Sequence, residues 1–409
     1  MTQPAGAPKP RQLLPFAALS ASYFAHIGFF NPYLPLWLQE QGLSLFTISL
    51  LASVQSATRL AAPYGWGWLS DHTGERVKLL RIAATTALLF SFGLWFNPWQ
   101  AVSDSGIFWI AVVLFVMFLQ TSAMMPMNEA ALAHLVSRGG VFDGQLYGRV
   151  RLWGSIGFMV TVFAAGAWFE GFGMRHLPEW NTAMLLAVAW SAWAMQDHKE
   201  AVPVHQEKLP IWPIMRQPAV QWFFASLFFH VLSHMSIYAF LSLYLDALGY
   251  SKTMIGVLWA VGVLVEIGWF FSQGRWLPRL PLTAWLVLCA LAMVLRMGLT
   301  AGLGAFLPVL VVAQALHAIT FAAHHSVCIA LLSHHFPGRL RGRGQALFTV
   351  IGYGFPGVLG GVLGGVLSAR FGLGVVFWAC LGTGLIASGC AWRVVRLQHG
   401  DESASSANS

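Results

Sequence analysis

The chain consists of long apolar runs separated by short polar segments. A helix that crosses a bilayer needs about 20 predominantly apolar residues, and a window of that length finds twelve runs. They cover approximately residues 13–37, 44–67, 79–97, 107–133, 148–170, 178–195, 218–246, 252–273, 281–301, 305–333, 345–368 and 371–394. We therefore predict an all-α membrane protein with twelve transmembrane helices. The run at 107–133 is long enough to bend, and Pro126 is one site for a kink.

A polar stretch at 196–217 divides this pattern into two parts of similar size. The sequence predicts an N-terminal six-helix half at 1–195, a linker at 196–217 and a C-terminal six-helix half at 218–396. Two such halves are typical of secondary transporters. The signal for 178–195 is the weakest of the twelve, and the Ser-rich tail at 397–409 is predicted to be disordered.

The basic residues indicate how the chain crosses the membrane. With the N-terminus inside, eighteen Lys and Arg residues fall in inner segments and three in outer segments. This bias follows the positive-inside rule, so we expect both termini in the cytoplasm and the protein in the cell inner membrane. The N-terminus has no cleavage site after a short apolar core, which favours a first spanning helix over a signal peptide.

Composition excludes a water-soluble fold. Charged residues make up 9% of the chain and hydrophobic residues 57%, whereas soluble domains carry about 25% charged residues. The net charge of +8 does not indicate nucleic acid as a partner, because the basic residues alternate between loops. The four cysteines lie in apolar runs without metal-ligand spacing, and we interpret them as small core residues.

Several ionisable residues lie inside the apolar runs, among them Arg59, Glu129, Glu266, Arg296 and His317. Such groups are costly in a bilayer and usually face a bundle interior or a water-filled cavity. We therefore interpret them as parts of a transport pathway, with a purely structural role as the alternative.

Three of these residues form the best candidate for chemistry. Glu266, Arg296 and His317 lie near the middle of three consecutive runs. Burial and a neighbouring arginine act in opposite senses on a carboxyl group, so Glu266 could load and release a proton. His317 could relay that proton or bind substrate. The role of His324 and His325 is left open, and packing is the simpler interpretation.

The first half offers candidates for substrate binding. Arg59, Glu129 and Arg151 leave a net positive charge, and the two arginines could bind a carboxylate. This favours an anionic substrate such as an aromatic acid, although Arg59 could instead form a structural pair with Glu129. Asn31 on the first run could also line the cavity.

The loop after the second run carries a recognisable motif. It reads Gly67-Trp-Leu-Ser-Asp71-His-Thr-Gly74-Glu-Arg76 and resembles the loop signature of the major facilitator superfamily. Gly67 would allow close helix approach, Gly74 would turn the chain, and Asp71 would cap a helix or pair with an arginine. By this resemblance Gly67, Asp71, Gly74 and Arg76 belong to a gating loop that helps latch the two halves. His72 and Glu75 depart from the family pattern, and an ordinary basic inner loop is the alternative.

Further stretches resemble the phenylpropionate permease group within the oligosaccharide/proton symporter branch of that superfamily. They include Tyr147–Ser155, Leu258–Glu266, Leu295–Gly298 and Gln314–Phe321, and the resemblance extends along most of the chain from Tyr23. It implies a major facilitator fold and a transport function.

The lactose permeases of the same branch imply residue roles. By this resemblance Glu266 corresponds to a carboxylate for sugar binding and proton coupling, and Arg296, His317 and Arg151 match an Arg, a His and a substrate-binding Arg. Thr320 stands where those permeases carry a proton-handling Glu, and we predict that it binds substrate. Glu129 lies about one turn before their substrate carboxylate. These departures weaken the case for the same proton mechanism and for sugar specificity.

We therefore predict a proton-coupled symporter of a small organic solute, with an aromatic carboxylic acid such as 3-phenylpropionate as the substrate class. The alternatives are a sugar or nucleoside symporter, a drug/proton antiporter and a non-transporting membrane sensor. An enzyme is not expected, and neither is a cofactor, because the proton gradient would drive transport and the chain lacks a nucleotide-binding loop of the Gly-x-x-x-x-Gly-Lys type. The glycines at 352–365 favour internal helix packing, so we expect a monomer in the lipid bilayer.

Overall fold

The structure is a computed structural model that describes residues 10–96, 102–138, 141–196, 210–337 and 340–407. Within this part, eleven helical segments are long and apolar enough to cross a membrane. The run at 178–195 forms a helix of 17 residues. Every predicted run is therefore helical, and the all-α prediction with twelve membrane helices is confirmed.

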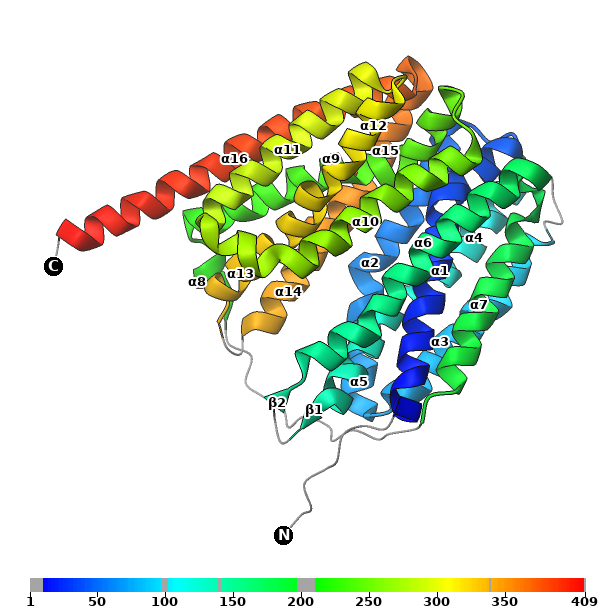
Figure 1. Cartoon of the computed structure of the whole chain (residues 1–409), viewed down its shortest axis with the longest axis horizontal. Helices are drawn as coiled ribbons and strands as arrows, with labels where there is room; N and C mark the ends of the chain where they lie inside the picture. Colours follow the sequence, from blue (N-terminus) through cyan, green and yellow to red (C-terminus); the bar gives the residue numbers. More distant parts are fainter. Residues whose placement is uncertain (1–9, 97–101, 139–140, 197–209, 338–339, 408–409) are drawn as a thin grey trace, which may run out of the picture. The chain divides into compact units, whose positions relative to one another are not determined.

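The helices that correspond to the twelve runs follow in order (Figure 1). They are α1 (Pro10–Glu40), α2 (Leu45–Thr73), α3 (Arg76–Ser91), α4 (Asp104–Thr121) with α5 (Met124–Val136), α6 (Gly144–Phe172), α7 (Leu177–Trp193), α9 (Pro218–Ala247), α10 (Lys252–Trp276), α11 (Leu282–Leu303), α12 (Leu307–Ala315) with α13 (His324–His335), α14 (Arg341–Thr349) with α15 (Phe355–Phe371), and α16 (Leu373–Ala407).

The remaining elements are short. The 3-10 turns are η1 (Phe92–Leu94), η2 (Met174–His176) and η3 (Leu277–Arg279), and α8 (Trp212–Met215) lies in the predicted linker. Strands β1 (Ser137–Arg138) and β2 (Val141–Phe142) pair antiparallel. Residues 197–209 of the linker lie outside the described part of the chain.

Three of the predicted runs are interrupted. The fourth breaks at Ser122 and Ala123, between α4 and α5. Pro126 follows at once and has no N–H to donate to the Ser122 carbonyl four residues earlier, which explains the break. The tenth and eleventh contain π-helical turns, η4 (Ala318–Ala323) and η6 (Val350–Gly354). Such turns often mark functional sites.

The tail differs from the prediction. Disorder was predicted from residue 397, but α16 continues to Ala407. Helix propagation requires far less free energy than nucleation, and the membrane helix that begins at Leu373 already supplies the nucleus.

The chain forms two compact units. One contains residues 1–43, 61–206 and 251–260, and the other contains residues 44–60, 207–250 and 261–409. The start of α2 thus packs in the second unit and the start of α10 in the first. The division into halves at the linker stays a prediction.

In the first unit, α1 packs against α6 and α7, and α3 packs against α4 and α7. The beginning of α10 fits closely onto α6. A Cβ added to Gly256 would lie 2.5 Å from the Val162 carbonyl oxygen, and one added to Gly166 would lie 2.6 Å from that of Lys252. Glycine is required at both positions for this approach. The Tyr33 hydroxyl on α1 donates to the Val162 carbonyl at 2.8 Å.

Replacing Tyr33 with phenylalanine is expected to lower the free energy of unfolding by about 1 kcal/mol, since one buried hydrogen bond is lost while the ring remains. Thermal unfolding of the purified protein would measure this. Tyr64→Phe is the matched control, because Tyr64 is an exposed residue of α2. Equal stability of the two variants would contradict this account of the contact.

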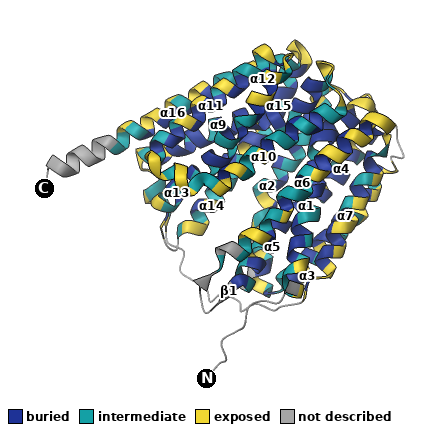
Figure 2. Cartoon of the chain, viewed as in Figure 1, coloured by how far each residue is buried: buried dark blue, intermediate teal, exposed yellow. Residues whose placement is uncertain are grey.

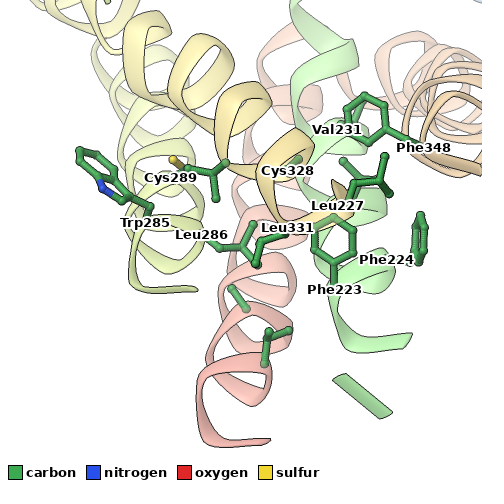
Figure 3. Packing of buried hydrophobic residues seen from close by; sticks show 14 of the residues in the cluster. Phe223, Phe224, Leu227, Val231, Trp285, Leu286, Cys289, Cys328, Leu331 and Phe348 are labelled. Carbon is green, nitrogen blue, oxygen red and sulfur yellow. The ribbon is translucent and has the colours of Figure 1, made fainter. Parts of the chain in front are cut away.

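In the second unit, α9 packs against α15 and α16, and α11 packs against α16. Figure 3 shows the apolar cluster at one end of these helices, which includes Phe223, Leu227 and Leu286. Cys289 and Cys328 lie in the same cluster, and all four cysteines are free and buried. This confirms their interpretation as core residues.

Three glycines of α15 face three serines of α2 in this unit. A Cβ on Gly357, Gly361 or Gly365 would overlap the Oγ atom of Ser56, Ser53 or Ser49, respectively. We call these six residues the glycine–serine seam. The glycine-rich stretch therefore packs internally at these positions, as the spacing of its small residues predicts.

Exposed residues, drawn in yellow, occur along many of the helices (Figure 2), and large apolar residues are among them. Phe108, Trp190 and Phe271 are each more than 70% exposed. An apolar surface of this extent is unsuited to water and fits contact with lipid.

Candidate proton and substrate site

A buried arginine organises the polar groups of the second unit. Arg296 on α11 is 1% exposed. Its Nη2 donates to Gln314 Oε1 at 2.9 Å, and its Nη1 lies 2.9 Å from Thr320 Oγ1 and 3.1 Å from His317 Nδ1. The planar guanidinium thereby links α11 to α12 and η4 through three neutral acceptors.

These contacts fix the tautomer of His317. A guanidinium only donates hydrogen bonds, so His317 Nδ1 must accept and the ring proton must lie on Nε2. His317 Nε2 is 3.4 Å from Glu266 Oε2 on α10 and faces it as a donor. Arg296, His317 and Glu266 thus form a chain in which each group is oriented by the one before. The sequence singled out these three residues as candidates for proton chemistry, and in the structure they lie together.

The π-helical turn η4 contributes Thr320 to the site. The Thr320 hydroxyl donates to the Leu316 carbonyl and accepts from Arg296. The Thr320 carbonyl accepts a hydrogen bond from His230 Nε2 on α9 at 2.7 Å. Thr320 in this π-helical turn therefore has hydrogen-bond partners on two other helices, Arg296 on α11 and His230 on α9. This position was predicted to bind substrate, whereas here its hydroxyl binds Arg296.

Aromatic groups surround the Glu266–His317 pair. The Phe321 ring stacks on His317 with centroids 4.8 Å apart, and Tyr238 on α9 lies within electrostatic range of Glu266, Arg59 and Arg296. Arg59 lies in the part of α2 that belongs to this unit, and it has no hydrogen bond or ion pair to another described residue. A half-buried guanidinium can bind a carboxylate.

The other predicted charges lie in the first unit. Glu129 on α5 accepts from Arg151 Nε on α6 at 2.8 Å, and both side chains are about one-third exposed. The Arg151 guanidinium lies over the Phe24 ring, 4.5 Å from its centroid. The ion partner of Glu129 in this unit is therefore Arg151 rather than Arg59, and Arg151 is already engaged by a carboxylate. Asn31 on α1 is half-buried.

The predicted gating loop is described in part. Gly74 follows the end of α2 with φ of 65°, the left-handed conformation that a turning glycine adopts. Arg76 Nε donates to Ser70 Oγ at 3.0 Å. A Cβ on Gly67 would meet no described atom within 4 Å, so the close helix approach predicted there is not observed. The Asp71 side chain lies outside the described part of the structure.

Three polar residues of this region were not predicted as site residues. Gln314 holds Arg296, His230 holds Thr320, and His234 is buried beside His317. Gln314 could have been found by its position one helical turn before His317 in an otherwise apolar run. His230 and His234 lie four residues apart on α9. His230 stacks on His324, with ring centroids 3.6 Å apart.

The sequence profile of the MFS_1 like family matches residues 18–379. The chain belongs to this family. It is therefore a multi-pass membrane transporter of the major facilitator fold and not an enzyme, which confirms the resemblance found in the sequence.

The sequence of the chain is similar to those of two named transport proteins. A probable 3-phenylpropionic acid transporter of Escherichia coli (strain K12) is 26% identical over 362 residues, which is 87% of this chain and 91% of that protein. A maltose permease of Geobacillus stearothermophilus is 32% identical over 145 residues, which is 35% of this chain and 34% of the permease.

Solved structures support the same fold. A point mutant of the nucleoside transporter NupG has a TM-score of 0.81 at 14% identity, covering 94% of this chain and 99% of that chain. A D-xylose-proton symporter has a TM-score of 0.66 at 14% identity, covering 94% of this chain and 97% of that chain. At this level of identity the likeness shows the major facilitator fold alone.

Proposed function

We propose that this major facilitator transporter is a proton-coupled symporter whose substrate is a small aromatic carboxylic acid such as 3-phenylpropionate. The observation that carries the proposal is the chain of contacts from Arg296 through His317 to Glu266. A carboxylate inside a membrane helix is costly, and this one is oriented by two further polar residues. Such an arrangement is suited to a group that changes its protonation state during a cycle.

In the proposed cycle Glu266 is the proton carrier. The ionised carboxylate accepts from His317 Nε2, and protonation removes the charge that strengthens this hydrogen bond. His317 is then free to reorient. Because Arg296 holds the opposite side of the ring, loading of Glu266 alters the contacts of α10, α11 and η4 together. Substrate binding and protonation can be coupled through this shared set of contacts.

The substrate class rests on charge and on aromatic surroundings. Arg59 supplies a cation without a described acidic partner, and Tyr238 and Phe321 supply rings beside the polar chain. A probable 3-phenylpropionic acid transporter is similar over most of the chain, which supports the same class here. Maltose and nucleosides are the competing substrates to test, since a maltose permease and a nucleoside transporter are also similar.

The membrane placement is part of the proposal. The distribution of Lys and Arg supports cytoplasmic termini in a cell inner membrane. The loop with Gly67, Asp71, Gly74 and Arg76 would then lie on the cytoplasmic side and act as a gate. We also propose that a monomer suffices for transport.

Replacement of Glu266 by glutamine is expected to abolish substrate-driven proton movement, a loss of at least about 100-fold, because an amide cannot carry the proton. Exchange of labelled for unlabelled substrate is expected to continue, because it needs no net proton transfer. The measurement uses proteoliposomes with a pH-sensitive dye inside and inward gradients of 3-phenylpropionate, maltose or a nucleoside. Glu179→Gln is the matched control, because Glu179 is an exposed carboxylate at the start of α7.

The outcomes separate the alternatives. Acidification of the lumen with 3-phenylpropionate, but not in empty liposomes, supports the proposal, and the empty liposomes correct for passive leak of the neutral acid. Acidification with maltose or a nucleoside alone would replace the substrate class. Alkalinisation of the lumen would indicate an antiporter. Tracer uptake without proton movement would refute coupling, and the absence of uptake and exchange would favour a sensor.

A further inference from the structure

His234 on α9 is a buried polar side chain without a hydrogen-bond partner among the described residues. It is 2% exposed, and neither Nδ1 nor Nε2 has a partner. An unsatisfied buried polar group costs about 1–3 kcal/mol, and such groups in a folded protein call for an explanation. The proposed function does not yet use this residue.

His234 lies beside residues of the candidate proton site. Its ring stacks on Phe321 at 5.4 Å and meets Tyr238 edge-on at 5.3 Å. The charged or titratable groups that act on it are Arg296 on α11, His317 before η4, His230 and Tyr238 on α9, and His324 on α13. His230 already donates to Thr320 and His324 stacks on His230. His317 is therefore the neighbour whose contacts can change.

The separation of the two imidazoles fits a hydrogen bond after ring rotation. The centroids of His234 and His317 are 5.5 Å apart, with the ring planes at 31°. Two imidazoles joined by an N–H···N bond have centroids roughly 5 Å apart, because the N···N distance is about 3 Å and each ring adds about 1 Å. The two rings are therefore about as far apart as an imidazole–imidazole hydrogen bond requires.

His317 cannot be protonated without a new acceptor. Its Nδ1 accepts from Arg296, and an imidazolium has N–H groups at both nitrogens. A protonated Nδ1 would place its hydrogen against the hydrogen of a guanidinium. The ring must then turn away from Arg296 and find a lone pair elsewhere. His234 has one in its neutral form, and at present that lone pair has no described partner.

We propose that His234 is the alternate partner of His317 and accepts the Nδ1–H of His317 in the proton-loaded state of the transporter. This inference rests on the proposed proton coupling. In the step, the His317 ring turns and the hydrogen bond from Arg296 to Nδ1 is released. Nδ1 then takes up a proton from a hydronium ion that reaches the site, and an N–H···N bond to His234 forms, while Nε2 keeps its proton toward Glu266. Arg296 keeps its contacts with Thr320 and Gln314. Unloading reverses each of these changes.

The test compares His234→Phe and His234→Gln with the wild-type protein in proteoliposomes. Phenylalanine keeps an aromatic ring but has no acceptor, whereas glutamine has one. His324→Phe is the matched control, because it removes another buried histidine of the second unit. Proton-driven uptake and substrate exchange are measured for each variant between pH 5 and pH 8, and thermal unfolding confirms that each variant is folded.

For His234→Phe we expect coupled uptake to fall about tenfold at neutral pH, the loss of one hydrogen bond to a charged group, while exchange stays within about twofold of wild type. The pH at which coupled uptake is half-maximal should fall by about one unit, because protonated His317 has lost its hydrogen-bond acceptor. His234→Gln should recover part of the uptake, and His324→Phe should keep the wild-type midpoint.

Two results would overturn the inference. The first is a wild-type pH profile in His234→Phe. The second is a parallel loss of uptake and exchange in both His234 variants, which would indicate a structural role. Glu266→Gln keeps this test separate from the proposed function. If Glu266→Gln still moves protons, proton coupling through Glu266 itself is wrong, whereas loss in Glu266→Gln together with wild-type behaviour of His234→Phe refutes the role of His234 alone.

Discussion

Replacement of Arg296 by leucine is expected to abolish transport and to destabilise the second unit. Gln314, Thr320 and His317 would each lose the donor that satisfies them in the interior. A buried acceptor that is left without its donor typically costs about 1–3 kcal/mol. Coupled uptake should fall below detection, and thermal unfolding should occur at a clearly lower temperature.

Arg296→Lys separates charge from geometry. Lysine keeps the charge but lacks the planar fork that reaches Gln314 on one side and His317 with Thr320 on the other. We expect a folded protein whose coupled uptake is lower by about 10- to 100-fold, equivalent to the loss of one or two hydrogen bonds. Arg279→Lys is the control, because Arg279 stacks on Trp276 outside the site. Normal coupled uptake in Arg296→Lys would contradict the assigned geometry.

Replacement of Gly361 by leucine is expected to disrupt the glycine–serine seam. Even the first carbon of a side chain would overlap Ser53 Oγ, so the two helices would have to separate. Overpacking of a well-packed interior typically costs about 1–3 kcal/mol. Thermal unfolding should therefore occur several degrees lower, and transport should fall because α2 and α15 no longer share the observed packing.

Two further variants test whether the contact itself is responsible. Gly382→Leu introduces the same side chain on α16 at a position with no described atom within 4 Å of an added Cβ, and it should unfold like the wild-type protein. Gly361→Ala combined with Ser53→Gly should be more stable than Gly361→Ala alone, since it removes the atoms that the new methyl group meets. An equal effect of leucine at Gly361 and Gly382 would refute the role of the seam.

The positions of the membrane helices could be predicted because length and hydropathy are local properties of the chain. The structure differs from the prediction where hydropathy does not determine the backbone geometry, namely at the helix break between α4 and α5 and at the π-helical turns. Pro126 indicated a bend, but the break at Ser122 and Ala123 follows from the missing N–H of that proline. Nothing in the apolar run containing Thr320 distinguishes a π-helical turn from an α-helix, because both present similar side chains to lipid.

Part of the candidate site could also be predicted, because charged residues inside apolar runs are visible in the sequence. Charges inside apolar runs are costly, so Glu266, Arg296 and His317 stood out as candidates before their contacts were known. Neutral partners such as Gln314 produce a much weaker signal, since their free energy depends on a specific acceptor or donor nearby. The pairing of Glu129 with Arg151 instead of Arg59 depends on helix packing, which the sequence alone does not specify.

The participation of α2 and α10 in both compact units has a mechanical consequence. The boundaries between the units fall after residue 60 in α2 and after residue 260 in α10. Pro63 lies just beyond the first and leaves the Arg59 carbonyl without its helical donor, and Gly262 lies just beyond the second, where the backbone is less restrained. We therefore expect both helices to bend at these points, on the microsecond to millisecond timescale of domain motions. Arg59 and Glu266 lie within one or two turns of these boundaries, so binding of an anion by Arg59 or protonation of Glu266 would act close to the points where the two helices pass between units.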